Sequence, residues 1–161
     1  LMAIADSHYH FTDWTGSTTS LMNPLDLLMD ADKSVTANFA ANLTTNHPTP
    51  EWWLAEYGIT NNIEEAVTND VDGDGIPTGD EYSMDTCPTN ADSYLRMHRI
   101  TSGQMEWIGG TGVLQYLEVS SDLSSNDWIT IATNTPPTPV TNTAPLAESA
   151  TNVFYRVRAV R

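Results

Sequence analysis

Apolar and polar residues alternate at both ends of the chain, a pattern typical of half-buried β-strands. Near the start, the runs Leu1 to Ala5 and His8 to Trp14 flank a short turn, and a later run, Ser34 to Phe39, again alternates between two faces. We expect a small β-meander over residues 1–41. Three aromatic residues are expected in its core: Phe11, Trp14 and Phe39.

The last part of the chain contains more such runs, separated by turns rich in glycine, serine, asparagine and proline. The expected strands are residues 95–100, 104–108, 113–120, 128–132 and 153–160. Turns at this density are typical of a β-sandwich, which we expect over residues 94–161. Arg156 and Arg158 are expected on a solvated strand face. The expected core aromatics are Trp107, Trp128 and Tyr155.

Between the two β-rich parts, the pattern becomes that of short helices. Residues 42–49 form a polar linker that ends in a good N-cap, Thr49. Pro50 suits the first helical position, and Gly58 suits the end of the helix. We therefore expect a helix from Pro50 to Tyr57, and a second short helical segment over residues 62–69.

A run of twelve residues from Asp70 to Glu81 places oxygen-bearing side chains at the spacing that an EF-hand calcium loop requires. Such a loop takes ligands from its first, third, fifth, seventh, ninth and twelfth residues, and has glycine at the sixth, here Gly75. The sequence therefore predicts a calcium (Ca²⁺) site. Its expected ligands are Asp70, Asp72, Asp74, the Ile76 carbonyl, Thr78 and Glu81.

The eighth residue of this loop is Pro77. In a paired EF-hand that residue usually offers its backbone N–H to a partner loop, and proline has no N–H to offer. We therefore expect a single, unpaired loop that braces a junction between modules. A calcium sensor would need a bistable helix pair.

Charge supports the same interpretation. The chain has 161 residues with 6 basic and 21 acidic side chains, a formal charge of −15, which argues against nucleic acid or an anionic membrane as a partner. Residues 51–92 contain 11 of the acidic side chains and no Lys or Arg. Such a segment repels itself unless cations bind. Small modules also need additional cross-links because their hydrophobic cores are small, and bound calcium would supply one.

The only cysteine is Cys87, so the chain can form no internal disulfide. Millimolar calcium suits weak extracellular sites, and we expect an extracellular or cell-surface location. No apolar run approaches the length of a membrane span. The chain opens abruptly on an apolar run, and we expect it to be the C-terminal part of a longer protein.

The first 41 residues closely resemble the second half of the bacterial repeat related to the internalin B repeat. The resemblance rests on His10 to Gly16, Asn23 to Leu25 and Met29 to Phe39. It implies a small β-rich unit of the kind found along secreted and surface proteins. The usual first half of the repeat is absent, so upstream residues of the same protein or a neighbouring copy are the expected partners that complete it.

Two further resemblances follow along the chain. Trp53 to Gly58, the acidic loop and Tyr82 to Ser93 look like calcium-binding linkers of large secreted bacterial proteins, similar to dockerin and thrombospondin type 3 loops. Cys87 replaces an aspartate of those linkers, and a second calcium at Asp85 and Asp92 stays open. A third resemblance, to a fibronectin type III-like C-terminal module, rests on residues 116–123, 127–128 and 154–158.

These observations predict a mainly β, multi-module chain. Its expected parts are a partial repeat (1–41), a linker (42–49), a calcium-binding helical segment (50–93) and a β-sandwich (94–161).

No catalytic motif is evident. The histidines His8, His10, His47 and His98 do not form a zinc-binding spacing such as H-E-x-x-H. His8 and His10 would share a strand face, which fits either a two-histidine metal site or an ordinary surface pair. No nucleophile elbow, P-loop or dinucleotide-binding motif follows a predicted strand. We therefore expect a chain that is not an enzyme.

Two classes of function remain. The first is a calcium-stabilised structural, assembly or anchoring region of a secreted or surface bacterial protein. The second is a carbohydrate-binding accessory region, in which the terminal sandwich or Trp52 and Trp53 would bind polysaccharide. Packing in a core is the other interpretation of these two tryptophans, and we favour it. Solvent exposure of the rings distinguishes the two.

Overall fold

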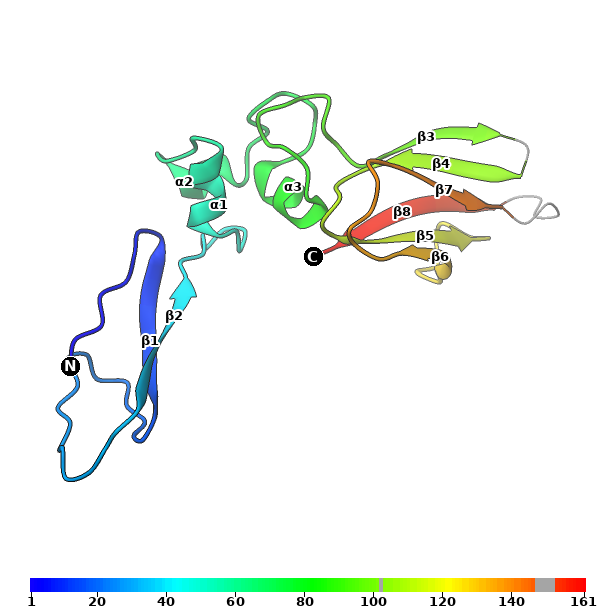
Figure 1. The fold of residues 1–161 in the computed structure, drawn as a ribbon. Coiled ribbons are helices and arrows are strands. Elements are labelled where there is room, and N and C mark those ends of the chain that lie inside the picture. Colours follow the sequence, from blue (N-terminus) through cyan, green and yellow to red (C-terminus); the bar gives the residue numbers. More distant parts are fainter. Residues whose placement is uncertain (102, 147–152) are drawn as a thin grey trace. The chain divides into compact units, whose positions relative to one another are not determined.

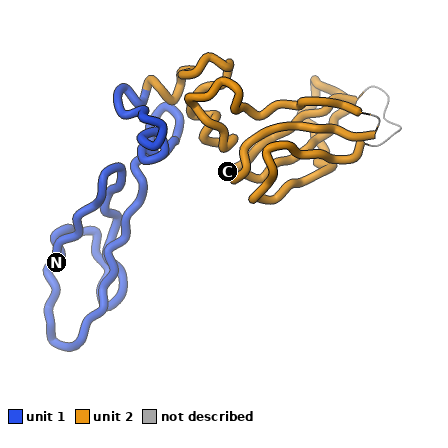
Figure 2. Tube along the Cα trace, turned by 45° about the horizontal axis from the view of Figure 1, so that its top comes forward, with its two compact units in different colours: residues 1–64 blue, residues 65–161 orange. Residues whose placement is uncertain are grey.

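A computed structural model describes residues 1–101, 103–146 and 153–161. Within these residues the chain forms two compact units, residues 1–64 and residues 65–161 (Figure 2). The described residues contain eight strands in three antiparallel sheets, together with three short helices (Figure 1). The predicted fold class, mainly β and multi-module, is confirmed. The four-part division at residues 41, 49 and 93 stays a prediction.

The first unit begins with a two-stranded antiparallel sheet of β1 (Tyr9–Gly16) and β2 (Val35–Ala41), with a bulge between Phe11 and Asp13. The buried centre of this region is Trp14, which packs with Ala3 and Leu25. Its indole N–H donates a hydrogen bond of 3.0 Å to the Met22 carbonyl oxygen. Trp14 is therefore buried as expected, and Phe11 packs against it.

Two expectations for this unit are wrong. Leu1 to Ala5 is not a strand, because the Asn23 side chain satisfies the backbone there: its Oδ1 accepts from Ala3 N at 2.9 Å, and its Nδ2 donates to Ala3 O at 2.7 Å. Phe39 is 41% exposed, because a sheet of two strands covers too little of the face beyond Phe11. The expected meander is thus a two-stranded sheet with long connections.

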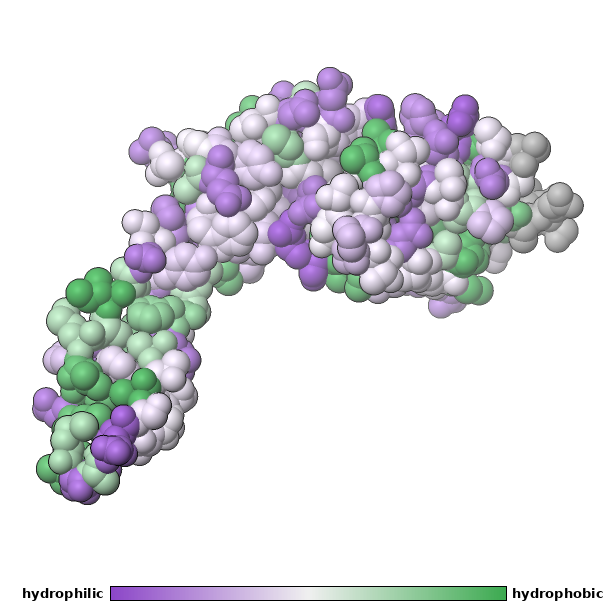
Figure 3. All heavy atoms as spheres, in the orientation of Figure 1, coloured by the Kyte–Doolittle hydropathy of each residue, from purple (hydrophilic) through white to green (hydrophobic). Residues whose placement is uncertain are grey.

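The same thin core leaves many apolar side chains of this region in solvent, and Figure 3 shows them gathered over it. The most exposed are Leu1, Met2, Ile4, Leu21, Met22, Leu28 and Met29.

Two helices follow, α1 (Glu51–Glu56) and α2 (Ile63–Ala66). The N-cap of α1 is Pro50, without a side-chain cap, and not Thr49 as expected. Thr49 is fully buried, and its N–H is bonded to the Thr44 hydroxyl. Gly58 follows the helix at a φ of 75°, a left-handed conformation that favours glycine.

The second unit is dominated by two three-stranded sheets. One contains β3 (Arg96–Thr101), β4 (Gln104–Ile108) and β7 (Thr141–Pro145), in that order. The other contains β6 (Ile129–Asn134), β5 (Leu114–Ser120) and β8 (Phe154–Val160). Buried residues of β4, β5 and β7 form the shared core between the sheets: Met105, Trp107, Leu117 and Ala144.

This arrangement is the expected sandwich, with two differences. Trp128 is half-buried and lies outside the core. Its ring instead forms a cation–π contact with the Arg156 guanidinium, which lies 4.2 Å from the ring centre. Strand β7 was not expected, because its sequence is polar and ends in proline. It forms by pairing along the whole of β4. Trp107 is fully buried and Tyr155 packs against the core, both as expected.

A third helix, α3 (Thr78–Met84), precedes the sandwich in the same unit. Its N-cap is Pro77, at a φ of −62°. The acidic loop leads directly into this helix, so the last two expected calcium ligands, Thr78 and Glu81, lie on α3.

Candidate metal centre

The acidic loop is closed at its base by backbone hydrogen bonds. Thr78 N donates to Asn69 O at 3.0 Å, and Gly79 N donates to Val67 O at 2.9 Å. Val67 is fully buried, which anchors this closure. The loop is thus held by its two ends, and its acidic residues face one another across a short span.

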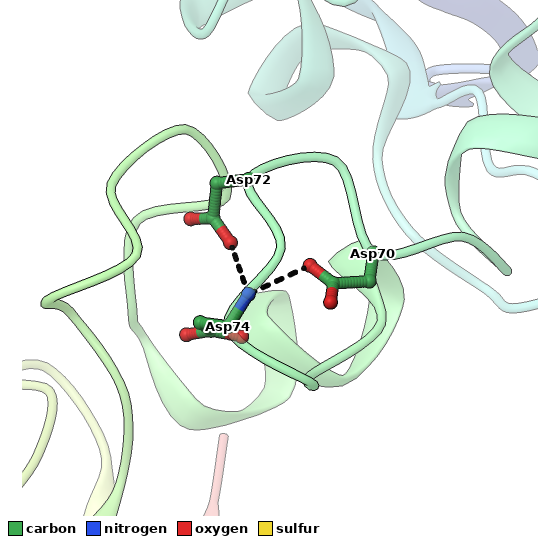
Figure 4. Close-up of side chains that lie close together, drawn as sticks. All are labelled: Asp70, Asp72 and Asp74. Carbon is green, nitrogen blue, oxygen red and sulfur yellow. Dashed lines mark hydrogen bonds between the residues drawn. The ribbon is translucent and has the colours of Figure 1, made fainter.

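The three aspartates of the loop converge. Asp70, Asp72 and Asp74 each offer a carboxylate oxygen, and these oxygens all lie within 4.8 Å of one another (Figure 4). Two glycines in the left-handed region turn the backbone between them, Gly73 at a φ of 85° and Gly75 at 96°. Within the described residues, no second cluster of three metal-ligating side chains is found.

Backbone N–H groups hold each aspartate in place. Asp70 accepts from Gly75 N and from Gly73 N, both at 2.7 Å. These bonds, that from Gly75 above all, lower the pKa of Asp70. Asp72 and Asp74 each receive a backbone N–H on one oxygen, at 3.3 Å from Asp74 N and 2.8 Å from Ile76 N. Each carboxylate therefore uses one or both oxygens to shape the loop.

The remaining oxygens are buried without a partner. Four buried side-chain oxygens in the described residues have no hydrogen-bond donor: Asp72 Oδ2, Asp74 Oδ2, Thr78 Oγ1 and Glu81 Oε2. All four belong to residues that the loop spacing assigns as ligands. Buried polar atoms in proteins are nearly always paired, and a bound cation would give these four oxygens a partner.

Glu81 carries the strongest electrostatic signature. It is fully buried, and burial together with the charges of Asp72, Asp74 and Asp70 raises the pKa of its carboxyl to about 8. Burial, together with the neighbouring carboxylates, also raises the pKa of Asp72. A bound divalent cation would lower the pKa values of Glu81 and Asp72, because its charge stabilises the ionised carboxylates.

The donor set fits calcium. Every group is a hard oxygen donor from a carboxylate, a hydroxyl or a backbone carbonyl, and no nitrogen or sulfur ligand is present. Asp72, Asp74, Thr78 and Glu81 would hold the ion through their unpaired oxygens. The roles of Asp70 and of the half-buried Ile76 rest on their places in the loop and stay predictions.

The other sites considered from sequence are not assembled. Asp85 Oδ2 accepts from Thr111 N at 3.1 Å and from Gly112 N at 2.7 Å, and its Oδ1 accepts from Arg161, so both oxygens already have partners other than a second calcium. His8 and His10 have different neighbours: His8 Nδ1 lies 3.4 Å from Glu51 Oε2, and His10 Nδ1 lies 2.8 Å from Asn42 Oδ1.

The tryptophans of α1 differ from each other. Trp53 is only 4% exposed, and its ring centre lies 5.0 Å from that of Tyr57 in an edge-on contact. Its ring is therefore not available as a platform for a sugar. Trp52 is half-buried.

A hollow of about 380 Å³ lies between β6 and β7. Its lining consists of threonine, asparagine and proline, and its buried Asn142 and Thr138 bond to backbone carbonyls of the same chain. It contains no carboxylate, so it offers no acid and base for glycoside hydrolysis.

Sequence reasoning missed a second buried carboxylate, Glu118 on β5, which is 4% exposed. Arg156 Nε donates to it at 2.7 Å and Arg158 Nη2 at 3.1 Å, both from the neighbouring strand β8. Arg156 and Arg158 keep 39% and 44% of their side-chain surface in solvent, in line with the expected solvated face, and both also pair with Glu118. Burial alone would raise the pKa of Glu118, but hydrogen bonds from Arg158 and Arg156 lower it. The alternation of residues along β5 and β8 indicates which side chains share a face of each strand. Only the register between the two strands places Glu118 beside Arg156.

Comparison with known families finds one similarity, in the first part of the chain. The model of the divergent InlB B-repeat domain matches residues 1–43. This confirms the predicted resemblance to the internalin B-type bacterial repeat, and it indicates a surface-associated structural region. The match covers less than half of the 161 residues. No curated protein and no solved structure matches the chain. None of the helices in the described residues has the length and apolar character to cross a membrane.

Proposed function

We propose that this chain is a non-catalytic, calcium-stabilised structural region of a secreted or surface bacterial protein, and that it serves in anchoring or assembly. One observation carries the proposal: the four buried oxygens without a donor lie in the one loop whose spacing matches a calcium site. The bacterial repeat at residues 1–43 supports the surface context.

Bound calcium would cross-link the loop and so stabilise the folded state. It would supply the positive charge that three converging aspartates and a buried glutamate lack, and would join the first half of the loop to α3. The residues themselves hold the loop in shape through their backbone hydrogen bonds. The resemblances of residues 50–93 to secreted calcium linkers, and of residues 94–161 to a fibronectin type III-like module, agree with this role.

The repeat supplies a second element of the proposal. Its sheet has two strands, so β2 has one edge without a neighbouring strand, and the outer edge of β1 is bridged at Trp14 by Ser20. Apolar side chains lie exposed nearby. An upstream segment of the same protein, or a neighbouring copy, would complete it by strand addition. The alternative role in polysaccharide binding loses one of its two tryptophans, because Trp53 is buried.

Isothermal titration calorimetry tests calcium binding directly. The wild-type chain is expected to bind one calcium ion, with Mg²⁺ much weaker because it demands a tighter octahedral site. Glu81→Gln should abolish measurable binding, because it removes the buried carboxylate of the site. Asp127→Asn, an exposed acid far along the chain from the loop, is the matched control and should bind as the wild type does. Equal heats for wild type and Glu81→Gln would contradict the proposal.

A further inference from the structure

The helix that holds the last two calcium ligands is fixed at its other end to the terminal sandwich. Asp85 follows α3 in the left-handed conformation, at a φ of 58°. Its Oδ2 accepts from Gly112 N at 2.7 Å and from Thr111 N at 3.1 Å. Its Oδ1 accepts from the Arg161 guanidinium, which also lies 4.3 Å over the ring of Tyr82 on α3.

The loop on the sandwich side, residues 109–112, fits closely against this end of α3. A Cβ atom at Gly110 would clash with the carbonyl oxygens of Met84 and Asp85, and one at Gly112 would lie 3.1 Å from Asp85 Oδ2. Gly110 is therefore required by the contact with α3, and Gly112 lies close against it, so the fit leaves little room for independent movement.

The same loop is tied to the core of the sandwich. Gln115 is fully buried, and its Nε2 donates to Gly110 O. Its Oε1 accepts from the indole N–H of Trp107 at 2.6 Å. Thr138 Oγ1 adds a second bond to Gly110 O at 3.1 Å. A movement of the loop would thus disturb the hydrogen bond of the core tryptophan.

On the calcium side, Asp85 lies one helical turn beyond Glu81. Thr86 N donates to Glu81 O at 3.0 Å, and Thr86 Oγ1 donates to Glu81 Oε1 at 3.3 Å. The side chain of Glu81 is therefore oriented by the residue directly after Asp85. Contacts run without a gap from Glu81 through Asp85 and Gly110 to Gln115 and Trp107.

We propose that Asp85 is a positioning residue that couples calcium at the loop to the sandwich core. It would fix α3 so that Glu81 is aimed into the loop, and the occupied loop would in turn hold α3 against residues 109–112. Coupling between two sites is reciprocal, so each should strengthen the other. This inference rests on the proposed calcium function.

Calcium titration of three variants provides the first test. Asp85→Gly removes the carboxylate while glycine keeps the left-handed backbone, and we expect calcium affinity to fall roughly five- to ten-fold. Asp85→Asn retains an oxygen that accepts from Thr111 and Gly112, and should restore most of the affinity. Glu118→Gln weakens the same sandwich without touching the contact, and should leave calcium affinity unchanged.

Hydrogen exchange supplies the second readout. In the wild type, calcium should slow exchange in residues 109–116 as well as in the loop, whereas in Asp85→Gly the slowing should stop at α3. Unchanged affinity in Asp85→Gly, or an equal loss in Glu118→Gln, would overturn the coupling while leaving the calcium function intact. Absence of calcium binding by the wild type would overturn both.

Discussion

Two buried glutamates in the second unit have opposite surroundings. Glu118 lies on β5 and meets two guanidinium groups, which lower its pKa. Glu81 lies on α3, has one oxygen without a donor, and is surrounded by three aspartates that help burial raise its pKa to about 8. A buried carboxylate needs a positive partner. Among the described residues, Glu118 has such partners and Glu81 does not.

This contrast follows from the small number of cationic side chains in an acidic chain. With 6 Lys and Arg against 21 acids, the chain places two arginines beside Glu118, whereas in the described residues no Lys or Arg is bonded to Asp72, Asp74 or Glu81. Backbone N–H groups position the aspartates of the loop. We interpret calcium as the partner that Glu81 lacks, and the two glutamates should respond differently to mutation and to chelation.

The largest effect is expected for Glu81→Gln in calcium. At a calcium concentration about 100 times Kd, binding should stabilise the wild type by about 2.7 kcal/mol, and the variant should lose this gain. In chelator, the variant should be no less stable than the wild type, because it removes a repelled buried carboxyl. Urea melts in both buffers measure this, and a variant that is weaker in chelator would contradict the comparison.

Glu118→Gln should behave in the opposite way. It removes the ionised acceptor of two arginine hydrogen bonds, and we expect a loss of about 2 kcal/mol in the free energy of unfolding. The loss should be the same with calcium and with chelator, since Glu118 makes no contact with the loop. A calcium-dependent loss, read from the same urea melts, would contradict the expectation that Glu118 has no effect on the calcium loop.

Acid should reduce the contribution of Glu118. Its pKa is lowered in the folded state from an ordinary value of 4.5, so its stabilisation is present above that value and is lost as pH falls through the folded pKa. The stability difference between wild type and Glu118→Gln should therefore shrink as pH decreases from about 6 to about 3. Chelator should be present throughout, and a constant difference would refute the assignment.

The smallest effect is expected for Asp92→Asn. Asp92 is exposed, and its expected partner Asp85 is occupied by the sandwich. We expect one calcium per chain and an affinity within about twofold of the wild type, since only a distant surface charge is lost. Calorimetric stoichiometry above one in the wild type, falling in the variant, would reinstate the second site.

The candidate site could be predicted from sequence because its ligands are neighbours in the chain. Spacing alone brings Asp70, Asp72 and Asp74 together, and local glycines supply the turn. Strands with strong alternation, such as β4 and β5, were predicted for the same local reason.

Features that depend on pairing across the fold could not be predicted. Glu118 meets Arg156 only because β5 and β8 align in one register. Strand β7 has no strand-like composition, and pairing with β4 decides its conformation. Nothing in the sequence distinguishes Asp85 from the other acidic residues. Its role depends on residues 109–112, which pack on it in the fold. In the first unit, Phe39 alternates correctly yet stays exposed, because no third layer covers it.

Calcium binding is tested most simply by a thermal melt of the wild-type chain in a scanning calorimeter, in millimolar calcium and again in excess chelator. We expect the transition of the second unit to move several degrees higher with calcium, in proportion to the ligand-linked stabilisation. Chelation should reverse the shift, and magnesium should not replace calcium. Identical melts in calcium and in chelator would contradict the claim that calcium is the missing partner of Glu81.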